Sequence, residues 1–242
     1  MVTDYNHKVS ICIPCYEMEN LGATFLYFSL SKILLQTYKN IEVVVSDHSR
    51  NDSILEICND FSKRGLEIIY LRNTEMIGNS CHNLNLCINS SNGDTIKILF
   101  QDDFLYHDNS ILDIVKVFEE NHDIHWLVTS CCHSENGSTF YNYMDPEYTD
   151  NILEGNNRIS SPSVLSFRNT DENLLFDPQF IWLMDCDYYY RMYKKFGLPY
   201  YLKKTNAVNR HWKGQLTQKI SEPVMQEEHK SILKKHNYGK DS

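Results

Sequence analysis

Four short apolar segments, each followed by a stretch with helical spacing, constrain the fold of this chain more than any other feature. They cover residues 9–14, 41–46, 66–71 and 95–100. Helical patterns occupy the intervening residues 20–37, 52–63 and 78–91. Strands that alternate with helices at this spacing build βαβ units and a parallel sheet. We therefore expect a single α/β domain with a mostly parallel central sheet flanked by helices.

The second half of the chain is less regular. Residues 108–120 and 182–196 have helical patterns, and residues 126–130 have the composition of a strand. Residues 131–160 are polar and rich in Asn, Gly and Tyr, so we expect a loop there. A further helix is expected at residues 222–236. Because no repeat or linker separates the halves, they are expected to pack as one unit.

Charge and cysteine usage exclude several classes of protein. A formal net charge of −9 argues against nucleic acid as a partner, since phosphate binding needs clustered Lys and Arg. The C-terminal basic residues favour a solvated helix face over contact with a membrane surface; they are Lys230, Lys234, Lys235, His236 and Lys240. The eight cysteines lie mostly in apolar runs, as expected of buried free thiols in a reducing cytoplasm. No apolar run approaches the ~20 residues of a membrane span.

Acidic side chains follow two of the predicted strands directly. Asp102 and Asp103 come after the segment 95–100, and Asp47 follows the segment 41–46. Adjacent carboxylates suit a hard divalent cation that also binds diphosphate oxygens, although capping of the helix near Asp108 fits them equally well. Asp47 is placed either to bind a nucleobase or to cap the next helix. Open α/β sheets bind ligands at the carboxyl ends of their strands, so these groups should converge.

Three further side chains are candidates for chemistry. Asp185 and Asp187 lie in an aromatic segment, where burial raises a carboxylate pKa and favours a general base. At this spacing on a helix they point apart, so one of them at most should enter a site; a pair that complements the helix dipole is the alternative. His211 is a candidate ligand for metal or phosphate, although a lone histidine is more often structural.

Five segments in this order resemble family 2 glycosyltransferases with the GT-A fold. They are residues 10–17 (SICIPCYE), 36–47 (QTYKNIEVVVSD), 78–85 (GNSCHNLN), 100–103 (FQDD) and 184–187 (MDCD). The likeness covers about residues 8–218. It implies a GT-A-like domain at 1–218, with a donor half at about 8–107, an acceptor half at about 108–218, and a helical tail at 219–242.

The resemblance also implies roles for individual residues. Pro14, Tyr16 and Glu17 would border the nucleoside pocket, and Asp47 would bind the base, commonly uracil. Asn83 and Asn85 would line the donor site. Asp103 would bind Mn²⁺ or Mg²⁺, and Asp102 would contact ribose or the metal. Asp185 would be the catalytic base beside Asp187, and His211 would contact metal or diphosphate.

The chain departs from the family pattern at two informative positions. Gln101 replaces a further Asp of the metal motif, and Met184 replaces the Glu before the base, which leaves the choice between Asp185 and Asp187 open. The implied reaction is inverting transfer from a nucleotide-diphosphate sugar, expected to be UDP-linked, to an acceptor hydroxyl. The expected acceptor is a glycan or lipid-linked glycan in surface polysaccharide assembly, in the cytoplasm or at the inner face of the plasma membrane.

Two alternatives to this enzyme remain open at the level of sequence. One is a catalytically silent nucleotide-sugar-binding homologue that acts as a partner protein. The other is a sugar nucleotidyltransferase, which is disfavoured because residues 14–22 contain no Gly-rich basic phosphate loop.

Overall fold

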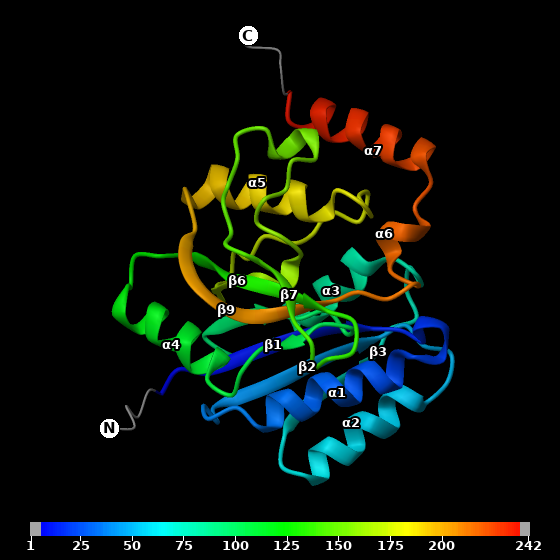
Figure 1. Ribbon diagram of the computed structural model, residues 1–242, viewed down its shortest axis with the longest axis vertical. Helices are drawn as coiled ribbons and strands as arrows, with labels where there is room; N and C mark the ends of the chain where they lie inside the picture. Colours follow the sequence, from blue (N-terminus) through cyan, green and yellow to red (C-terminus); the bar gives the residue numbers. More distant parts are fainter. Residues whose placement is uncertain (1–5, 238–242) are drawn as a thin grey trace.

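The protein is built around one sheet that runs through the whole molecule. The computed structural model describes residues 6–237. Within them nine strands form this sheet (Figure 1). The sheet is therefore shared by the two halves of the sequence.

The N-terminal half forms the parallel part of the sheet, as predicted. β1 pairs in parallel with both β2 and β4, and β2 pairs in parallel with β3. The strands are β1 (Val9–Cys15), β2 (Ile41–Asp47), β3 (Glu67–Arg72) and β4 (Thr95–Ile98). The connecting helices are α1 (Gly22–Leu34), α2 (Ser53–Lys63) and α3 (Ser80–Asn89), with a short turn η1 (Met18–Asn20) before α1.

The C-terminal half contains more strands than its sequence pattern indicates. They are β5 (Phe104–Leu105), β6 (Trp126–Ser134), β7 (Tyr141–Met144), β8 (Leu165–Arg168) and β9 (Tyr200–Arg210). The helical segments are α4 (Ser110–Glu120), η2 (Ile152–Glu154), η3 (Pro162–Val164), α5 (Met184–Phe196), α6 (Leu216–Lys219) and α7 (Glu222–Lys235). The expectation of a loop throughout residues 131–160 was wrong, because β6 continues to Ser134 and forms a hairpin with β7. Across the sheet the order is β3-β2-β1-β4-β8-β6-β9-β5, and β7 pairs with β6 outside this path. β9 runs parallel to β6, whereas β8 is antiparallel to β4 and β6.

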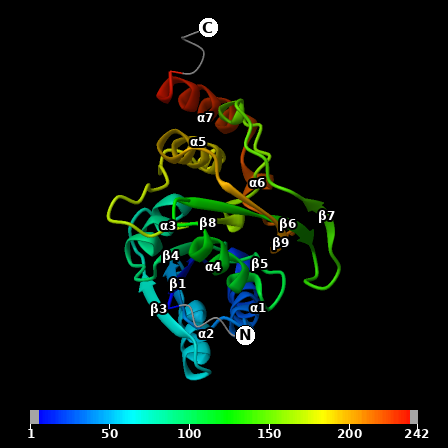
Figure 2. The ribbon, with the colours of Figure 1, turned by 90° about the vertical axis from the view of Figure 1, so that its left-hand side faces the viewer.

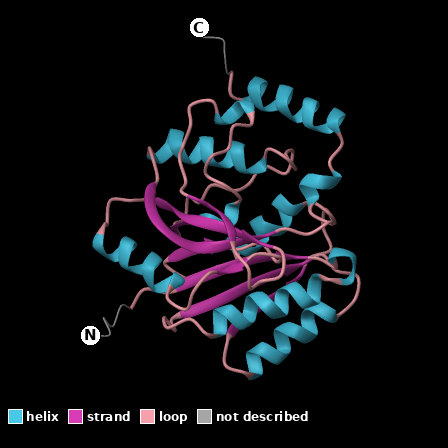
Figure 3. Cartoon of the chain, in the orientation of Figure 1, coloured by secondary structure: helices cyan, strands magenta, loops and turns pink. Residues whose placement is uncertain are grey.

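Helices cover both faces of the sheet and create two hydrophobic layers (Figures 2 and 3). Successive strand residues point to opposite faces, so Ile11 and Ile13 belong to one layer and Cys12 to the other. The first layer contains α1, α2 and α4. The second contains α3 and α5, and Ile232 of α7 joins it. This arrangement leaves the carboxyl edge of the parallel strands to carry polar groups.

All eight cysteines are buried and unpaired, as expected from their positions in apolar runs. Within residues 6–237, no helix combines the length and the apolar character that a membrane crossing requires. Of the basic C-terminal residues, Lys240 lies outside the described residues.

Candidate functional site

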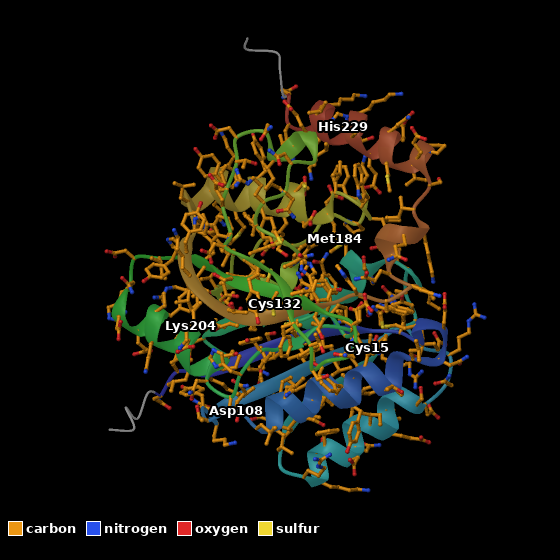
Figure 4. All side chains as sticks on the ribbon, in the orientation of Figure 1. Cys15, Asp108, Cys132, Met184, Lys204 and His229 are labelled. Atoms are coloured by element: carbon orange, nitrogen blue, oxygen red, sulfur yellow. The ribbon has the colours of Figure 1, made fainter. Side chains whose placement is uncertain are left out.

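The carboxyl ends of the parallel strands bring the predicted acidic residues to one edge. Cys15 is the register partner of Asp47, which places the segment after β1 beside the end of β2. β4 lies on the other side of β1 and leads directly to Asp102 and Asp103. Figure 4 marks this edge by Cys15. The convergence expected from strand topology is thus present.

Asp103 is buried and held from two directions. Its Oδ1 accepts a 2.9 Å hydrogen bond from the backbone N–H of Arg210, at the end of β9. Its Oδ2 accepts a 2.6 Å bond from the Ser163 hydroxyl. Ser163 also accepts from the N–H of Phe100 at 2.9 Å, and its carbonyl oxygen accepts from the buried Lys97 ammonium. The carboxylate is therefore fixed by segments that lie far from it in sequence.

Asp102 is bound by the same end of β9. The indole Nε1 of Trp212 donates to its Oδ2 at 2.8 Å, and Nε of Arg210 donates to its carbonyl oxygen at 2.9 Å. The Arg210 guanidinium packs between the rings of Phe25, Phe28 and Phe104, at 4.9–5.1 Å from their centroids. These contacts leave the Arg210 side chain little freedom.

The two carboxylates form an electrostatically unfavourable pair in the free protein. Burial raises the pKa of Asp103, and the adjacent Asp102 charge raises it further. Burial also raises the pKa of Asp102. Arg210 supplies positive charge nearby, yet its guanidinium donates to the Asp102 carbonyl oxygen rather than to either carboxylate. A divalent cation would remove this repulsion.

The protein ligands available here fit such a cation only if the substrate supplies the remaining ligands. Among residues 6–237, no group of three or more His, Cys, Asp or Glu side chains is arranged to hold a metal. Mg²⁺ is commonly bound through one or two carboxylates together with substrate phosphates and water. The pair Asp102 and Asp103 matches that pattern.

His211 belongs to a different cluster. Its Nδ1 lies 2.9 Å from the hydroxyl of Tyr141, and its ring centroid is 4.4 Å from that of His133. The structure therefore does not bring His211 into a three-residue metal group with Asp102 and Asp103.

Gln101, the departure from the family pattern, has a structural role in this chain. Its side chain is buried, and its Oε1 accepts from the N–H of Tyr16 at 2.9 Å. Its Nε2 donates to the carbonyl oxygen of Gly22 at 2.8 Å. A carboxylate has no N–H to offer Gly22, so the amide is the side chain that links the end of β1 to the start of α1.

The predicted nucleoside-binding residues border the turn between β1 and α1. Pro14 is buried within β1, whereas Tyr16 is 41% exposed at the edge. Glu17 accepts from the N–H of Arg50. Met18 and the two residues after it have φ of 46°, 55° and 70°, a left-handed run that is costly for side chains other than Gly. Strain of this kind accumulates at ligand sites.

Asp47 is fully buried at the end of β2. Its Oδ1 accepts from the N–H of Ser49 at 2.8 Å, and its Oδ2 accepts from the Tyr70 hydroxyl at 2.7 Å. Arg72 lies 3.7 Å from the same oxygen. Both carboxylate oxygens of Asp47 thus already have partners within the protein.

Asn83 and Asn85 are both buried and engaged with the backbone of other segments. Asn83 donates to the carbonyl oxygen of Cys15 at 3.0 Å and accepts from Ser46 at 2.5 Å. Asn85 makes two bonds to the backbone of Phe176, with N···O distances of 2.7 and 2.8 Å. In this structure both amides support the chain around the edge rather than present free groups.

Asp185 and Asp187, in the first turn of α5, have different surroundings. Asp185 accepts from Nδ2 of Asn157 and from the N–H of Cys186, both at 2.7 Å, and burial raises its pKa. Asp187 is fully buried and ion-paired with Arg191 at 2.7 Å, and also with two residues at the end of α7. Those are Lys235 at 2.6 Å and His236 at 2.8 Å.

The pKa of Asp187 is shifted in the opposite direction to that of Asp185. Burial alone would raise the pKa of Asp187, but the hydrogen bond from His236 and the charges of Arg191 and Lys235 outweigh burial and lower the pKa to about 2. The two carboxylates thus point to different partners, as their spacing on the helix predicts. Lys235 and His236, two of the basic residues near the C-terminus, therefore bind Asp187.

Comparison with known proteins decides the family. Residues 10–193 match the sequence pattern described as glycosyl transferase family 2. The chain belongs to glycosyl transferase family 2.

A curated relative also carries the name of a glycosyltransferase, and two solved structures share the fold. The glycosyltransferase GlyA of Streptococcus pneumoniae serotype 4 is 31% identical over 117 residues, which are 48% of this chain and 16% of GlyA. S. aureus TarS 1-349 in complex with UDP-GlcNAc has a TM-score of 0.66 and 19% identity, covering 93% of this chain and 66% of that one.

The second structure is the mannosyltransferase PcManGT from Pyrobaculum calidifontis, in complex with GDP-Man and Mn²⁺. It has a TM-score of 0.63 and 17% identity, and covers 85% of this chain and 57% of that one. By comparison, the segment matched to GlyA spans only about a sixth of that curated relative. The structural likenesses confirm the GT-A fold.

Several residues of this glycosyltransferase were not identified from its sequence. Arg210, Trp212 and Ser163 hold the aspartate pair, and Asn157 holds Asp185. Arg210 and Trp212 flank His211, so the aromatic and basic segment around that histidine was a partial signal. Ser163 and Asn157 lie in a polar stretch that has no distinguishing pattern.

Proposed function

We propose that this family 2 glycosyltransferase transfers a sugar from a nucleoside-diphosphate sugar to an acceptor hydroxyl with inversion, and that it requires a divalent metal. The observation that carries the proposal is the pair of half-buried Asp102 and buried Asp103, held by Arg210 and Ser163 at the edge where the parallel strands end. Asp103 would be the principal ligand of Mn²⁺ or Mg²⁺, with Asp102 as an auxiliary. When bound, the cation would neutralise charge on the departing diphosphate.

UDP is the nucleotide that we propose for the donor. In this proposal Asp47 would accept from the imide N–H of uracil, and Arg72, 3.7 Å from Asp47, would donate to a carbonyl oxygen of the base once the nucleotide rearranges their present contacts. The complex of TarS with UDP-GlcNAc supports the choice, whereas the complex of PcManGT with GDP-Man makes GDP the competitor to test.

We assign the base to Asp185. A base must accept the proton of the acceptor hydroxyl as the new bond to the anomeric carbon forms, on the face opposite the leaving group. Burial raises the pKa of Asp185 and thus increases its proton affinity, while Asn157 orients the carboxylate. Asp187 already binds Arg191, Lys235 and His236, so its role in the proposal is structural.

A thermal-shift screen of UDP-, GDP- and dTDP-sugars, with and without Mn²⁺, tests this function. We expect stabilisation by a UDP-sugar that depends on Mn²⁺ and is lost in Asp103→Ala. Asp108→Ala, at an exposed position of the following loop, is the matched control and should respond like the unmodified protein. Equal metal-dependent stabilisation of Asp103→Ala would refute the metal assignment.

Donor hydrolysis separates the enzyme from a silent homologue. Slow release of UDP from the preferred sugar nucleotide, with water as acceptor, is expected for the enzyme and absent from a protein that only binds the donor. The acceptor that we propose, a glycan or lipid-linked glycan of surface polysaccharide assembly, is tested afterwards with the donor identified by the screen.

A further inference from the structure

Helix α7 packs on η2, which also contacts α5, and side chains at the end of α7 reach α5 directly. Figures 1 and 2 both show α7 beside α5, and Figure 4 labels His229 on α7 and Met184 at the start of α5. Ile232 of α7 is fully buried in the core layer that contains α5. At the end of α7, Lys235 and His236 bind Asp187. The last described helix is therefore joined to the helix that carries Asp185.

Glu228 of α7 binds the backbone immediately before α5. Its Oε1 accepts from the N–H of Ile181 at 2.8 Å, and its Oε2 accepts from the N–H groups of Trp182 and Leu183 at 2.9 and 3.0 Å. The glutamate is only 7% exposed. A buried carboxylate that accepts three backbone hydrogen bonds is held in one position and holds its donors in turn.

These contacts hold the residues that lead into α5, not the free N–H groups of its first turn. The first N–H groups of a helix have no partner within the helix, and Leu183 at the N-cap position provides no side-chain acceptor. A negative charge at this end also interacts favourably with the helix dipole. Glu228 supplies this charge from a separate helix, and it binds the N–H of Leu183, two residues before Asp185.

The opposite side of the same segment is fixed by α3. Asn85 binds the backbone of Phe176 through two hydrogen bonds, and Nδ2 of Asn79 donates to the carbonyl oxygen of Pro178 at 2.8 Å. Residues 176–183 thus lie between α3, which belongs to the donor half, and α7. The entry to α5 is held from both sides.

We propose that Glu228 is a positioning residue for the transfer reaction, acting through the start of α5 on the placement of Asp185. The proposal rests on the proposed function, because it takes Asp185 as the base. A displacement of about 1 Å in a catalytic group can lower a rate by about 10²-fold. Loss of the Glu228 contacts should therefore reduce turnover, while the nucleotide, which the proposal places at the ends of β1 and β2, keeps its affinity.

Glu228→Gln tests this, with Glu227→Gln as the matched control on the exposed face of the same helix. Glutamine has the size of glutamate, but its amide NH₂ group replaces one of the two oxygens that accept hydrogen bonds. That NH₂ group would face backbone N–H groups and could not accept from them. We expect kcat for UDP-sugar hydrolysis to fall about tenfold or more in Glu228→Gln, with the Kd for UDP and Mn²⁺ within about twofold of the unmodified protein. Glu227→Gln should leave both unchanged.

Glu228→Asp provides a second variant, since it keeps the charge and shortens the reach. Its kcat should lie between those of the unmodified protein and Glu228→Gln. Unchanged kcat in Glu228→Gln, an equal loss in Glu227→Gln, or a proportionate loss of UDP affinity would overturn the proposal.

Hydrogen exchange separates failure of this inference from failure of the proposed function. If no sugar nucleotide is bound or hydrolysed by the unmodified protein, the proposed function fails. The amides of Ile181, Trp182 and Leu183 should still exchange faster in Glu228→Gln than in Glu227→Gln. Equal protection of these amides in the two variants would show that Glu228 does not fix the start of α5.

Discussion

The backbone N–H of Arg210 lies 2.9 Å from Oδ1 of Asp103, and the side chain of the same arginine binds the carbonyl oxygen of Asp102. One residue at the end of β9 therefore orients both aspartates that follow β4. In the sheet, β8 and β6 lie between β4 and β9, so the contact ties the two halves of the domain together at the proposed metal site.

Arg210→Lys should weaken metal binding. Lysine keeps the charge but lacks the planar fork that donates to Asp102 while packing against three aromatic rings. Loss of a residue that orients a metal ligand typically costs 10–100-fold in affinity, and we expect about tenfold here because the backbone N–H to Asp103 remains. The Mn²⁺ dissociation constant in the presence of UDP, from paramagnetic resonance of free Mn²⁺, measures it. An unchanged constant would show that Arg210 is not needed to orient the pair.

Asp185→Asn and Asp187→Asn should fail in different ways. The first should retain its melting temperature and donor affinity and lose about 10²–10⁴-fold in turnover, the range typical for removal of a general base. The second should lose stability, by about 2–4 kcal/mol, because Arg191 and Lys235 would be left without their buried partner. Melting curves and turnover of both variants test this difference. If Asp187→Asn lost turnover and Asp185→Asn lost stability, Asp187 would be the base.

The same ion cluster should make the protein sensitive to acid. The pKa of Asp187 is about 2 in the folded protein, below the value of about 3.9 expected for an unfolded chain. Its contribution, about 2 kcal/mol, is present above about pH 4 and is lost as the pH falls toward 2. The difference in unfolding free energy between the unmodified protein and Asp187→Asn should shrink over this interval. A difference that stays constant from pH 6 to about 2 would contradict the assignment.

Gly22→Ala should disturb the turn between β1 and α1. A Cβ at this position would lie 2.2 Å from the carbonyl oxygen of Tyr16 and 2.8 Å from Nε2 of Gln101. Relief of that overlap requires movement of the backbone, so we expect a loss of about 1–3 kcal/mol in stability and weaker nucleotide binding. Urea unfolding and UDP titration test both effects; tolerance of alanine without either loss would count against the tight turn.

The parallel half of the fold was predictable because its signals are local. Residues 41–46 are β-branched and apolar, and the helical spacing after them leaves few alternatives. β9 gave no such signal, since Lys203, Lys204 and Asn206 interrupt any alternation. Its strand conformation depends on pairing with β6, which comes from a distant part of the chain.

The residues of the candidate site also divide into those that local sequence signals predict and those that they do not. Asp47, Asp102 and Asp103 could be placed together from strand topology alone. Ser163 and Glu228 could not, because they lie 60 and 45 residues from the groups they bind, Asp103 and Leu183. No spacing rule connects side chains across such separations.

The burial of all eight cysteines has a practical consequence for experiments on this enzyme. Since none of them is exposed, thiol reagents should leave the native protein unmodified while it stays folded. A single cysteine introduced at Tyr143, which is 58% exposed on β7, would then be the one accessible attachment point for a fluorophore. The native sequence thus already provides the background for site-specific labelling next to the cluster of His133 and His211.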